Sequence, residues 1–158
     1  MDDATRKQVL RLFTYGLYAI TVAEGERRNA FTANWLTQVS FDPPLVALSV
    51  ENDSASLPMI QRTGRFVINI YRADQRNLAG QLGHSLLTHP DKLAGLSFAE
   101  TASGAPYLPE TLAHVECAVE SITPAGDSSV VIARVVDVGR HGSGEPLTMK
   151  AAGFRHAG

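Results

Sequence analysis

Residues 31–50 read FTANWLTQVSFDPPLVALSV, and this stretch indicates both a fold class and a binding site. It begins with polar residues and ends in an apolar run. The run Leu45–Val50 has the length and composition of a buried β-strand. Such a strand does not require the hydroxyls, amides and indole that precede it. Small polar groups beside an aromatic ring, placed where a strand enters a sheet, suit a flat and polar heterocyclic ligand.

Hydrophobic periodicity divides the rest of the chain into short strands and a few short helices. Strands are expected at residues 17–23, 28–33, 45–50, 65–71, 115–122, 129–138 and 146–150. Helices are expected at residues 4–14, 54–63 and 75–82, with Gly16 ending the first and Gly64 just past the second. Residues 83–112 carry frequent Gly and Pro and predict a long surface excursion with short elements.

The pattern of elements favours a mainly β protein. Its connections are too irregular for repeated βαβ units, so a parallel sheet is not expected. Asp42-Pro43-Pro44 interrupts any ladder just before the strand at 45–50. An antiparallel sheet that closes, or nearly closes, into a barrel is the economical way to protect the edges of so many short strands.

The composition excludes several classes of protein. The 158 residues suffice for one domain with a proper core, and the net charge of −2 argues against a nucleic-acid surface. One cysteine, Cys117, rules out an internal disulfide framework and is expected to be an inert core residue. No Cys/His set has zinc spacing, so no metal site is predicted. The acidic start and the lack of a long apolar run predict a cytoplasmic protein with no membrane partner.

Several motifs, taken in order, resemble the flavin reductase-like, FMN-binding split-barrel family. Residues 32–45 are similar to the family pattern T-A-N-S-F-T-S-V-S-x-x-P-P-L, with Trp35 at the fourth position. Residues 66–70 resemble its F-x-V-N-V strand, and residues 112–117 resemble its L-A-x-L-E-C strand. The resemblance covers nearly the whole chain. It implies one domain over residues 1–158, a six-stranded antiparallel Greek-key split β-barrel with short flanking helices.

The resemblance also implies a flavin site, with FMN expected and FAD as the alternative. The residues that would line it are Thr32, Ala33, Asn34, Trp35, Leu36 and Thr37, with Ser49 in the next strand. Composition alone favours an ordinary strand–turn–strand with its polar residues facing outward, and the resemblance reverses this preference. Ser54 and Ser56 open an expected helix whose free amides suit a phosphate, although simple helix capping is the alternative. Asn69 would lie near the flavin or else face solvent. Arg65, Arg72 and Arg76 could neutralise a phosphate or be solvated surface charges.

NADH or NADPH is the implied co-substrate, delivering hydride from nicotinamide C4 to flavin N5. Gly126-Asp127-Ser128 sits where most members of the family carry G-D-H, whose histidine is associated with the nicotinamide side of the flavin. Ser128 is smaller, uncharged and unable to stack. The pattern is kept at Asp127 and departs at Ser128. This departure predicts slow reduction of the flavin by NAD(P)H and faster reduction in a Ser128→His variant. His84 or His156 could instead supply the missing group.

The predicted function is an NAD(P)H-dependent flavin oxidoreductase. The alternative is a flavin-binding electron carrier of the flavoredoxin kind, reduced by a partner protein. A relative that has shifted to haem or a deazaflavin is a third interpretation with no residue to support it. The resemblance implies a homodimer with flavin at the subunit interface, to which residues 82–87, Leu93 and Leu96 could contribute. An electron-transfer or monooxygenase partner would consume the reduced flavin.

Overall fold

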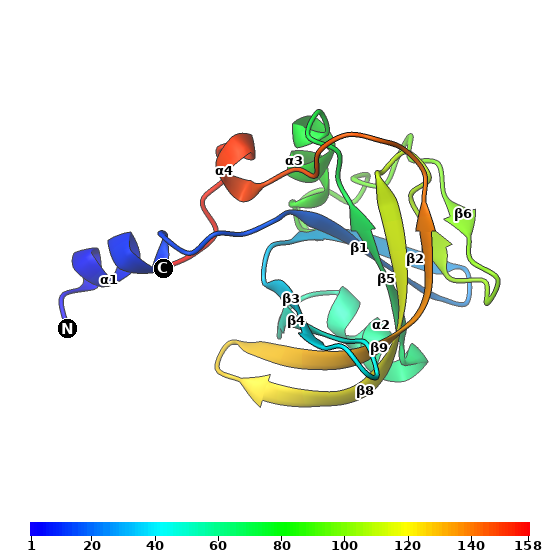
Figure 1. The fold of residues 1–158 in the computed structure, drawn as a ribbon, viewed down its shortest axis with the longest axis horizontal. Coiled ribbons are helices and arrows are strands. Elements are labelled where there is room, and N and C mark those ends of the chain that lie inside the picture. The colour runs from blue at the N-terminus through cyan, green and yellow to red at the C-terminus, as the bar shows by residue number, and fades with distance from the viewer.

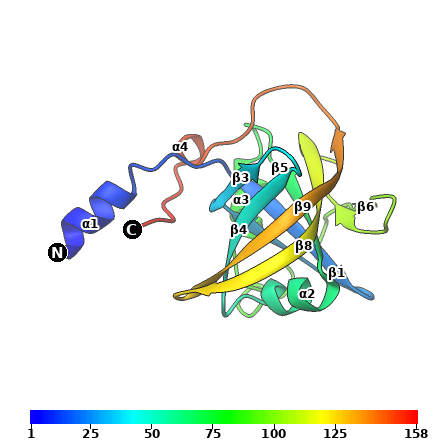
Figure 2. The same ribbon diagram turned by 60° about the horizontal axis from the view of Figure 1, so that its bottom comes forward.

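The computed structural model describes residues 1–158, and one antiparallel sheet dominates it. Its strands are β1 (Tyr18–Glu24), β2 (Arg27–Ala33), β3 (Leu36–Ser40), β4 (Leu45–Glu51), β5 (Arg65–Ile70), β8 (Ala113–Ala125) and β9 (Ser128–Arg140). They lie in the order β2-β1-β5-β8-β9-β4-β3. Figures 1 and 2 show the sheet curling round a core, with the long β8–β9 hairpin along one side. The mainly β antiparallel fold is confirmed, with seven strands in the sheet instead of six.

Short helices and one small strand pair surround the sheet. They are α1 (Asp3–Leu10), α2 (Ser56–Thr63), α3 (Arg76–Leu82), α4 (Met149–Ala152), β6 (Ala99–Glu100) and β7 (Pro106–Tyr107). The predicted stop of α2 is confirmed, because Gly64 adopts the left-handed conformation with φ of 65°. Residues 83–112 form the expected excursion, which holds only β6 and β7. None of the four helices has the length and apolar character needed to cross a membrane.

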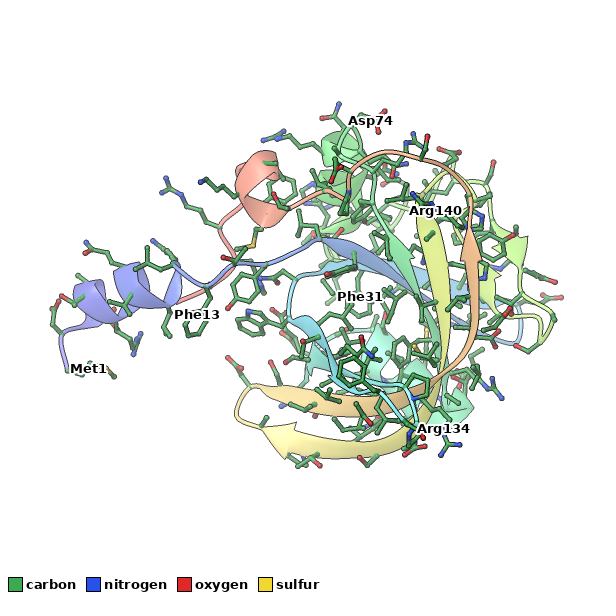
Figure 3. All side chains as sticks on the ribbon, in the orientation of Figure 1. Met1, Phe13, Phe31, Asp74, Arg134 and Arg140 are labelled. Carbon is green, nitrogen blue, oxygen red and sulfur yellow. The ribbon has the colours of Figure 1, made fainter.

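Helix α1 is shorter than its sequence predicts and stands away from the barrel in both views (Figures 1 and 2). It ends at Leu10 and buries none of its residues. Without a packed face, propensity alone does not carry the helix further. Gly16 is not its C-cap, because this glycine forms an isolated bridge with Thr148. Leu12 and Phe13, which follow the helix, are exposed, and Figure 3 shows Phe13 on the projecting segment.

Two strand assignments made from the sequence need correction. The strand expected at 146–150 is wrong, because Pro146 and Thr148 form only isolated bridges and a helix begins at Met149. Thr148 caps that helix, since its hydroxyl accepts from the amide of Ala151 at 3.1 Å. Strand β3 was not expected at all. It is an edge strand with exposed Thr37 and Gln38, so it lacks the apolar alternation that would reveal it.

The sheet separates two apolar cores. The first fills the barrel and includes Ile20, Leu48 and Phe66, with Phe31 packed against it near the centre of Figure 3. The second lies on the outer face and is covered by α3, α4 and parts of the excursion, with members such as Tyr71 and Leu82. Cys117 belongs to the first core, and burial raises the pKa of its thiol to about 12. The prediction that Cys117 is inert packing is therefore confirmed.

Strands β2 and β3 are the two edges of the sheet, although they follow one another in the sequence. Only Asn34 and Trp35 link them. The barrel is therefore not closed by hydrogen bonds at this place. The polar motif at residues 32–37 crosses this gap, so the fold presents the motif where the barrel is open.

Candidate functional site

A cleft of about 830 Å³ lies beside the gap between β2 and β3. Its volume falls in the range of small-molecule sites, roughly 300–1,000 Å³. The walls come from the ends of β2 and β4, the start of α2, helix α3 with the loop after it, and residues 149–156. A second cavity of about 290 Å³ lies near β1, β5 and residues 103–106, and Arg65 is the only one of the candidate residues that lines it. The larger cleft is the candidate site.

Aromatic and apolar side chains form much of the cleft wall. Phe31 and Trp35 come from β2 and the link after it, and Met149 and Phe154 come from the segment around α4. The indole of Trp35 is 37% exposed, although it is the largest apolar side chain of the motif. Partly exposed flat rings in a concave site offer a stacking surface to a planar ligand.

The structure divides the predicted motif into two groups. Thr32, Ala33 and Trp35 line the cleft, as does Ser49 from β4. Leu36 and Thr37 do not line the cleft, because both belong to β3 and pair with β4 opposite Leu48 and Ala47. The hydroxyl of Thr32 donates to the carbonyl of Ala79 at 2.7 Å and lies 2.8 Å from the Tyr71 hydroxyl. Its side chain thus ties β2 to α3.

Ser54 and Ser56 differ in their positions. Ser54 lines the cleft, and its hydroxyl accepts from the amide of Ser56 at 3.1 Å. Ser56 is fully buried and does not line the cleft, but it accepts from the amide of the cleft residue Asn29 at 2.6 Å. The N-cap residue of α2 is Ala55, which has no side-chain cap and also lines the cleft. Ser54 thus caps the Ser56 amide, as the capping alternative expected, while the partial positive charge of the first turn lies at the cleft wall.

Asn29 is a cleft residue that the sequence did not single out. It lies in β2, is 3% exposed and lines the cleft. Its amide nitrogen donates to Ser56, but its Oδ1 atom is buried without any hydrogen-bond partner. A buried acceptor normally has a donor, so this atom calls for a ligand hydroxyl or amide. An asparagine within a strand was the available signal, because asparagine is depleted in strands.

Lys92 is the second unforeseen residue of the cleft. It is 5% exposed and makes no ion pair. Its ammonium donates to the carbonyls of His84 at 2.9 Å and Leu82 at 3.4 Å. Burial lowers the pKa of this amine. A buried cation without a carboxylate, at the wall of a cleft, is suited to an anionic ligand.

Asn69 and Asp127 lie elsewhere. Asn69 is fully buried, donates to Ala19 and Thr21 at 3.0 Å, and accepts from the amide of Leu108 at 2.7 Å. The side chain neither faces solvent nor lines the candidate cleft, so it occupies neither of the two positions expected from the sequence. Asn69 lies on the outer face of the sheet in the β1–β5 ladder. Its hydrogen bonds join β5 to β1 and to the excursion at residues 83–112. Asp127 is exposed in the β8–β9 turn and does not line the cleft.

The three arginines considered as phosphate ligands do not line the cleft. Arg65 pairs with the buried Glu116, and Arg72 pairs with Asp74. Arg76 instead secures the segment beside the cleft. Its Nε donates to the carbonyl of Ala152 at 2.6 Å, and its guanidinium lies 5.2 Å from the centre of the Phe154 ring.

Three residues connected with the expected nicotinamide side do line the cleft: Ser128, His84 and His156. Ser128 is 4% exposed, and its hydroxyl donates to Asp127 at 3.2 Å. His84 is exposed and stacks on His89 with ring centroids 3.9 Å apart. His156 lies beside Trp35, with ring centroids 5.3 Å apart. No group of three or more His, Cys, Asp or Glu side chains is arranged to hold a metal ion.

Comparison with known proteins gives one consistent family. The family model described as "Flavin reductase like domain" matches residues 10–158. The chain is 36% identical over 143 residues to a high molecular weight rubredoxin of Moorella thermoacetica, covering 89% of this chain and 62% of the relative. It is 34% identical over 151 residues to the diflavin flavoprotein A 1 of a Synechocystis strain, covering 94% of this chain and 26% of the relative. The chain thus spans less than two thirds of these two relatives.

A third relative and one solved structure match over more of their length. The reductase subunit HsaB of a flavin-dependent monooxygenase from Rhodococcus jostii is 30% identical over 147 residues, covering 93% of this chain and 74% of the relative. The structure of BorF, the flavin reductase component of a bacterial two-component tryptophan halogenase, superposes with a TM-score of 0.80. It is 30% identical and covers 99% of this chain and 98% of its own. The chain therefore belongs to the family defined by the flavin reductase like domain.

Proposed function

We propose that this protein binds FMN in the 830 Å³ cleft and is an NAD(P)H-dependent flavin oxidoreductase. One observation carries the proposal. A single cleft is lined by aromatic side chains, by a buried acceptor without a hydrogen-bond partner, and by groups suited to bind a phosphate. Reduced flavin, or electrons from it, would pass to a partner enzyme. HsaB and BorF are reductase components of two-component systems, and this supports such a partner.

The residues fit each part of FMN. Phe31 and Trp35 suit the flat isoalloxazine ring. The orphan Oδ1 of Asn29 suits a hydroxyl of the ribityl chain. Ser54, the open start of α2 and the Lys92 ammonium suit the terminal phosphate. FMN is preferred to FAD because its phosphate ends the molecule and carries the larger local charge.

The chain's own contribution to catalysis would be binding, orientation and exclusion of water. When bound, the flavin supplies the hydride acceptor, and the nicotinamide supplies the donor. Trp35 and Phe31 would stack on the flavin ring, and the contacts with the phosphate would fix the position of that ring along the cleft. Ser128, His84 and His156, which also line the cleft, would be left to contact the dinucleotide. Correct orientation of the two reactants is worth several kcal/mol of barrier lowering, so no acid, base or nucleophile is required.

The second candidate is a flavin-binding electron carrier with little NAD(P)H activity. Ser128 in place of the family's usual histidine favours it, as does the likeness to a high molecular weight rubredoxin. The two candidates differ in one measurable property. The oxidoreductase is reduced rapidly by NADH or NADPH alone, whereas the carrier is reduced only when a reductase partner is added.

Two measurements on the purified protein test the proposal. The visible spectrum after reconstitution with FMN should show bound oxidised flavin, and a titration should give tighter binding for FMN than for FAD. Anaerobic stopped-flow mixing with NADH or NADPH should then bleach the flavin bands. A protein that binds no flavin contradicts the whole proposal, and flavin that is bleached by dithionite but not by NAD(P)H leaves the carrier.

The two serines of the α2 region should separate in their effects. Ser54→Ala should weaken FMN binding by about tenfold, the value expected when one hydrogen bond to a charged group is lost. Ser56→Ala should leave the FMN dissociation constant nearly unchanged but lower the free energy of unfolding by about 1–2 kcal/mol, because Asn29 loses its partner. Fluorescence titration and urea unfolding give the two numbers. Equal FMN affinity in Ser54→Ala would show that Ser54 does not contact the phosphate.

A homodimer remains part of the proposal, but the residues expected at its interface need correction. Leu82 is fully buried, and Leu93 and Leu96 pack against the outer core of the same chain. Among the leucines expected at the interface, only Leu87 is strongly exposed, at 91%. The sequence could not show that these leucines cover the outer face of the sheet. Other apolar side chains are exposed instead: Val9, Leu12, Phe13, Val39, Phe41, Val136 and Val138.

We expect light scattering to give a mass about twice that of the 17.0 kDa chain. Leu12 and Phe13 follow a helix that buries none of its residues, so a second copy is their expected cover. Replacing both with serine should shift the protein toward monomer and should not alter far-UV circular dichroism. A wild-type protein that is monomeric with FMN fully bound would contradict the dimer.

A further inference from the structure

The motif residue Asn34 does not take the place in the flavin site that the family resemblance implies. It is 5% exposed and does not line the cleft. Its amide nitrogen donates to the carbonyl of His156 at 2.9 Å and to the sulfur of Met149 at 3.3 Å. Its Oδ1 lies 3.0 Å from Nδ1 of His156. Both partners belong to residues 149–156, so Asn34 joins the link between β2 and β3 to the segment around α4.

The segment of residues 153–158 makes no backbone–backbone hydrogen bond with the sheet. The last such bond before it runs from the amide of Met149 to the carbonyl of Tyr15, at 3.0 Å. Beyond this bond, the backbone hydrogen bonds stay within residues 148–154. Gly153 ends α4 in the left-handed conformation, with φ of 73°, and turns the chain out of the helix. Side chains of other elements therefore hold the 153–158 segment in place.

These side chains come from two different walls of the cleft. Arg76 of α3 holds the start of the segment through its contacts with Ala152 and Phe154. Two residues after Phe154, the chain reaches His156, which Asn34 holds from the link after β2. The residues between these two attachments line the cleft. The 153–158 segment thus connects the wall made by α3 with the wall beside β2, and Figure 1 shows it running from α4 toward the end of α1.

Asn34 is the buried attachment at the far end of this segment. The other contacts there are exposed: His156 and Glu51 are 56% and 58% exposed, and Arg11 donates to the carbonyl of Ala157 at the surface. Exposed contacts compete with water and contribute little. The Asn34 amide is almost fully buried, so water cannot replace its hydrogen bonds until the segment moves away. Asn34 is therefore the main attachment at this end.

We propose that Asn34 is a positioning residue that latches the 153–158 segment across the cleft, and that opening of this latch controls how fast flavin enters and leaves. The inference rests on the proposed binding of FMN. The latch joins groups of the chain only, so it holds the segment in the free and the flavin-bound protein alike. Flavin then passes in either direction only through the open form. Weakening the latch raises both rate constants by one factor and leaves their ratio, the dissociation constant, nearly unchanged.

The test compares Asn34→Leu with Asn52→Leu by stopped-flow fluorescence of FMN. Asn52 is an exposed asparagine that bonds to Gly126 and Ser129 and does not line the cleft. Rapid dilution of the complex gives the dissociation rate constant, and mixing with excess protein gives the association rate constant. We expect both to rise about tenfold in Asn34→Leu only. Two hydrogen bonds to His156 are lost, and each is worth roughly three- to tenfold in an equilibrium constant.

Tryptic cleavage reports the latch without any flavin. Arg155 is exposed and directly precedes the latched residue, and a protease cleaves after it only when the segment is free of the cleft. Intact mass should show faster cleavage after Arg155 in Asn34→Leu, by about the same factor as the flavin rate constants, and no change in Asn52→Leu. Arg76→Met removes the other attachment without altering Asn34 and should act in the same direction. Urea unfolding checks that each variant is folded.

The outcomes that would overturn the inference are distinct. If cleavage after Arg155 is faster in Asn34→Leu but both flavin rate constants are unchanged, the segment does not control flavin exchange, while FMN binding stands. If only dissociation is faster and the dissociation constant rises by the same factor, Asn34 acts on the flavin directly and no latch is involved. If the unaltered protein binds no FMN, the proposed function itself fails, and the inference fails with it.

Discussion

Replacing Asn69 with leucine should lower the free energy of unfolding by about 3 kcal/mol. The side chain makes four buried hydrogen bonds: it donates to the carbonyls of Ala19 and Val67 and to the Thr21 hydroxyl, and it accepts from the amide of Leu108. Leucine has a similar volume but cannot form these hydrogen bonds, so the buried amide of Leu108 loses its acceptor, and an unsatisfied buried group costs about 1–3 kcal/mol. Urea unfolding followed by tryptophan fluorescence measures the change.

Asn77→Leu is the matched control for this variant. Asn77 is exposed on α3, so its replacement should change stability by no more than about 0.5 kcal/mol. FMN binding of folded Asn69→Leu should be close to that of the unaltered protein. A stable Asn69→Leu protein that has lost FMN would reverse the conclusion and return Asn69 to the flavin site.

Replacing Lys92 with methionine should weaken FMN binding by about 10- to 100-fold. The buried ammonium has no carboxylate partner and would pair with the phosphate, and a hydrogen bond to a charged group is worth about 1.5–3 kcal/mol. Methionine keeps the length and apolar character of the stem, so the fold should be retained. Fluorescence titration should show that riboflavin, which has no phosphate, binds both proteins equally.

Lys150→Met controls for loss of a positive charge, since Lys150 is exposed on α4 and does not line the cleft. The pH dependence gives a second check. Burial lowers the pKa of Lys92, so the free protein loses this charge at a lower pH than an ordinary lysine does. As the pH is raised, the FMN affinity of the unaltered protein should therefore begin to fall at a pH below about 10.4, the usual pKa of lysine. Lys92→Met should lack this fall. Equal affinity in both proteins at neutral pH would remove Lys92 from the site.

Local patterns in the sequence predicted those parts of the fold that local physics decides. Leu45–Val50 is a strand because a continuous apolar run must be buried, and α2 ends at Gly64 because glycine tolerates the left-handed conformation. Strand β3 escaped prediction because an exposed edge strand carries polar residues on its face. The strand expected at 146–150 failed because only isolated bridges form there.

The candidate site divided in the same way. Trp35 and Ser54 line the cleft, and both lie in the sequence segments that carry the family resemblance. Asn29 and His156 owe their places to contacts between segments far apart in the chain, and Lys92 owes its place to hydrogen bonds with the loop that precedes it. Periodicity cannot report such contacts. Leu36 and Thr37 illustrate the opposite error, because pairing with β4 removed them from a site that the motif seemed to include.

The neighbouring strands β2 and β3 stand at opposite edges of the sheet, and this has a kinetic consequence. Five other strands, drawn from residues 18 to 140, must pair before the sheet brings its two edges together beside the cleft. Non-local pairings of this kind are slow to form. A ligand bound in the cleft, whose walls come from β2, β4 and the helices, can therefore act only on the completed barrel. Raising the ligand concentration should therefore lower the unfolding rate in a chevron plot and leave the refolding rate nearly unchanged.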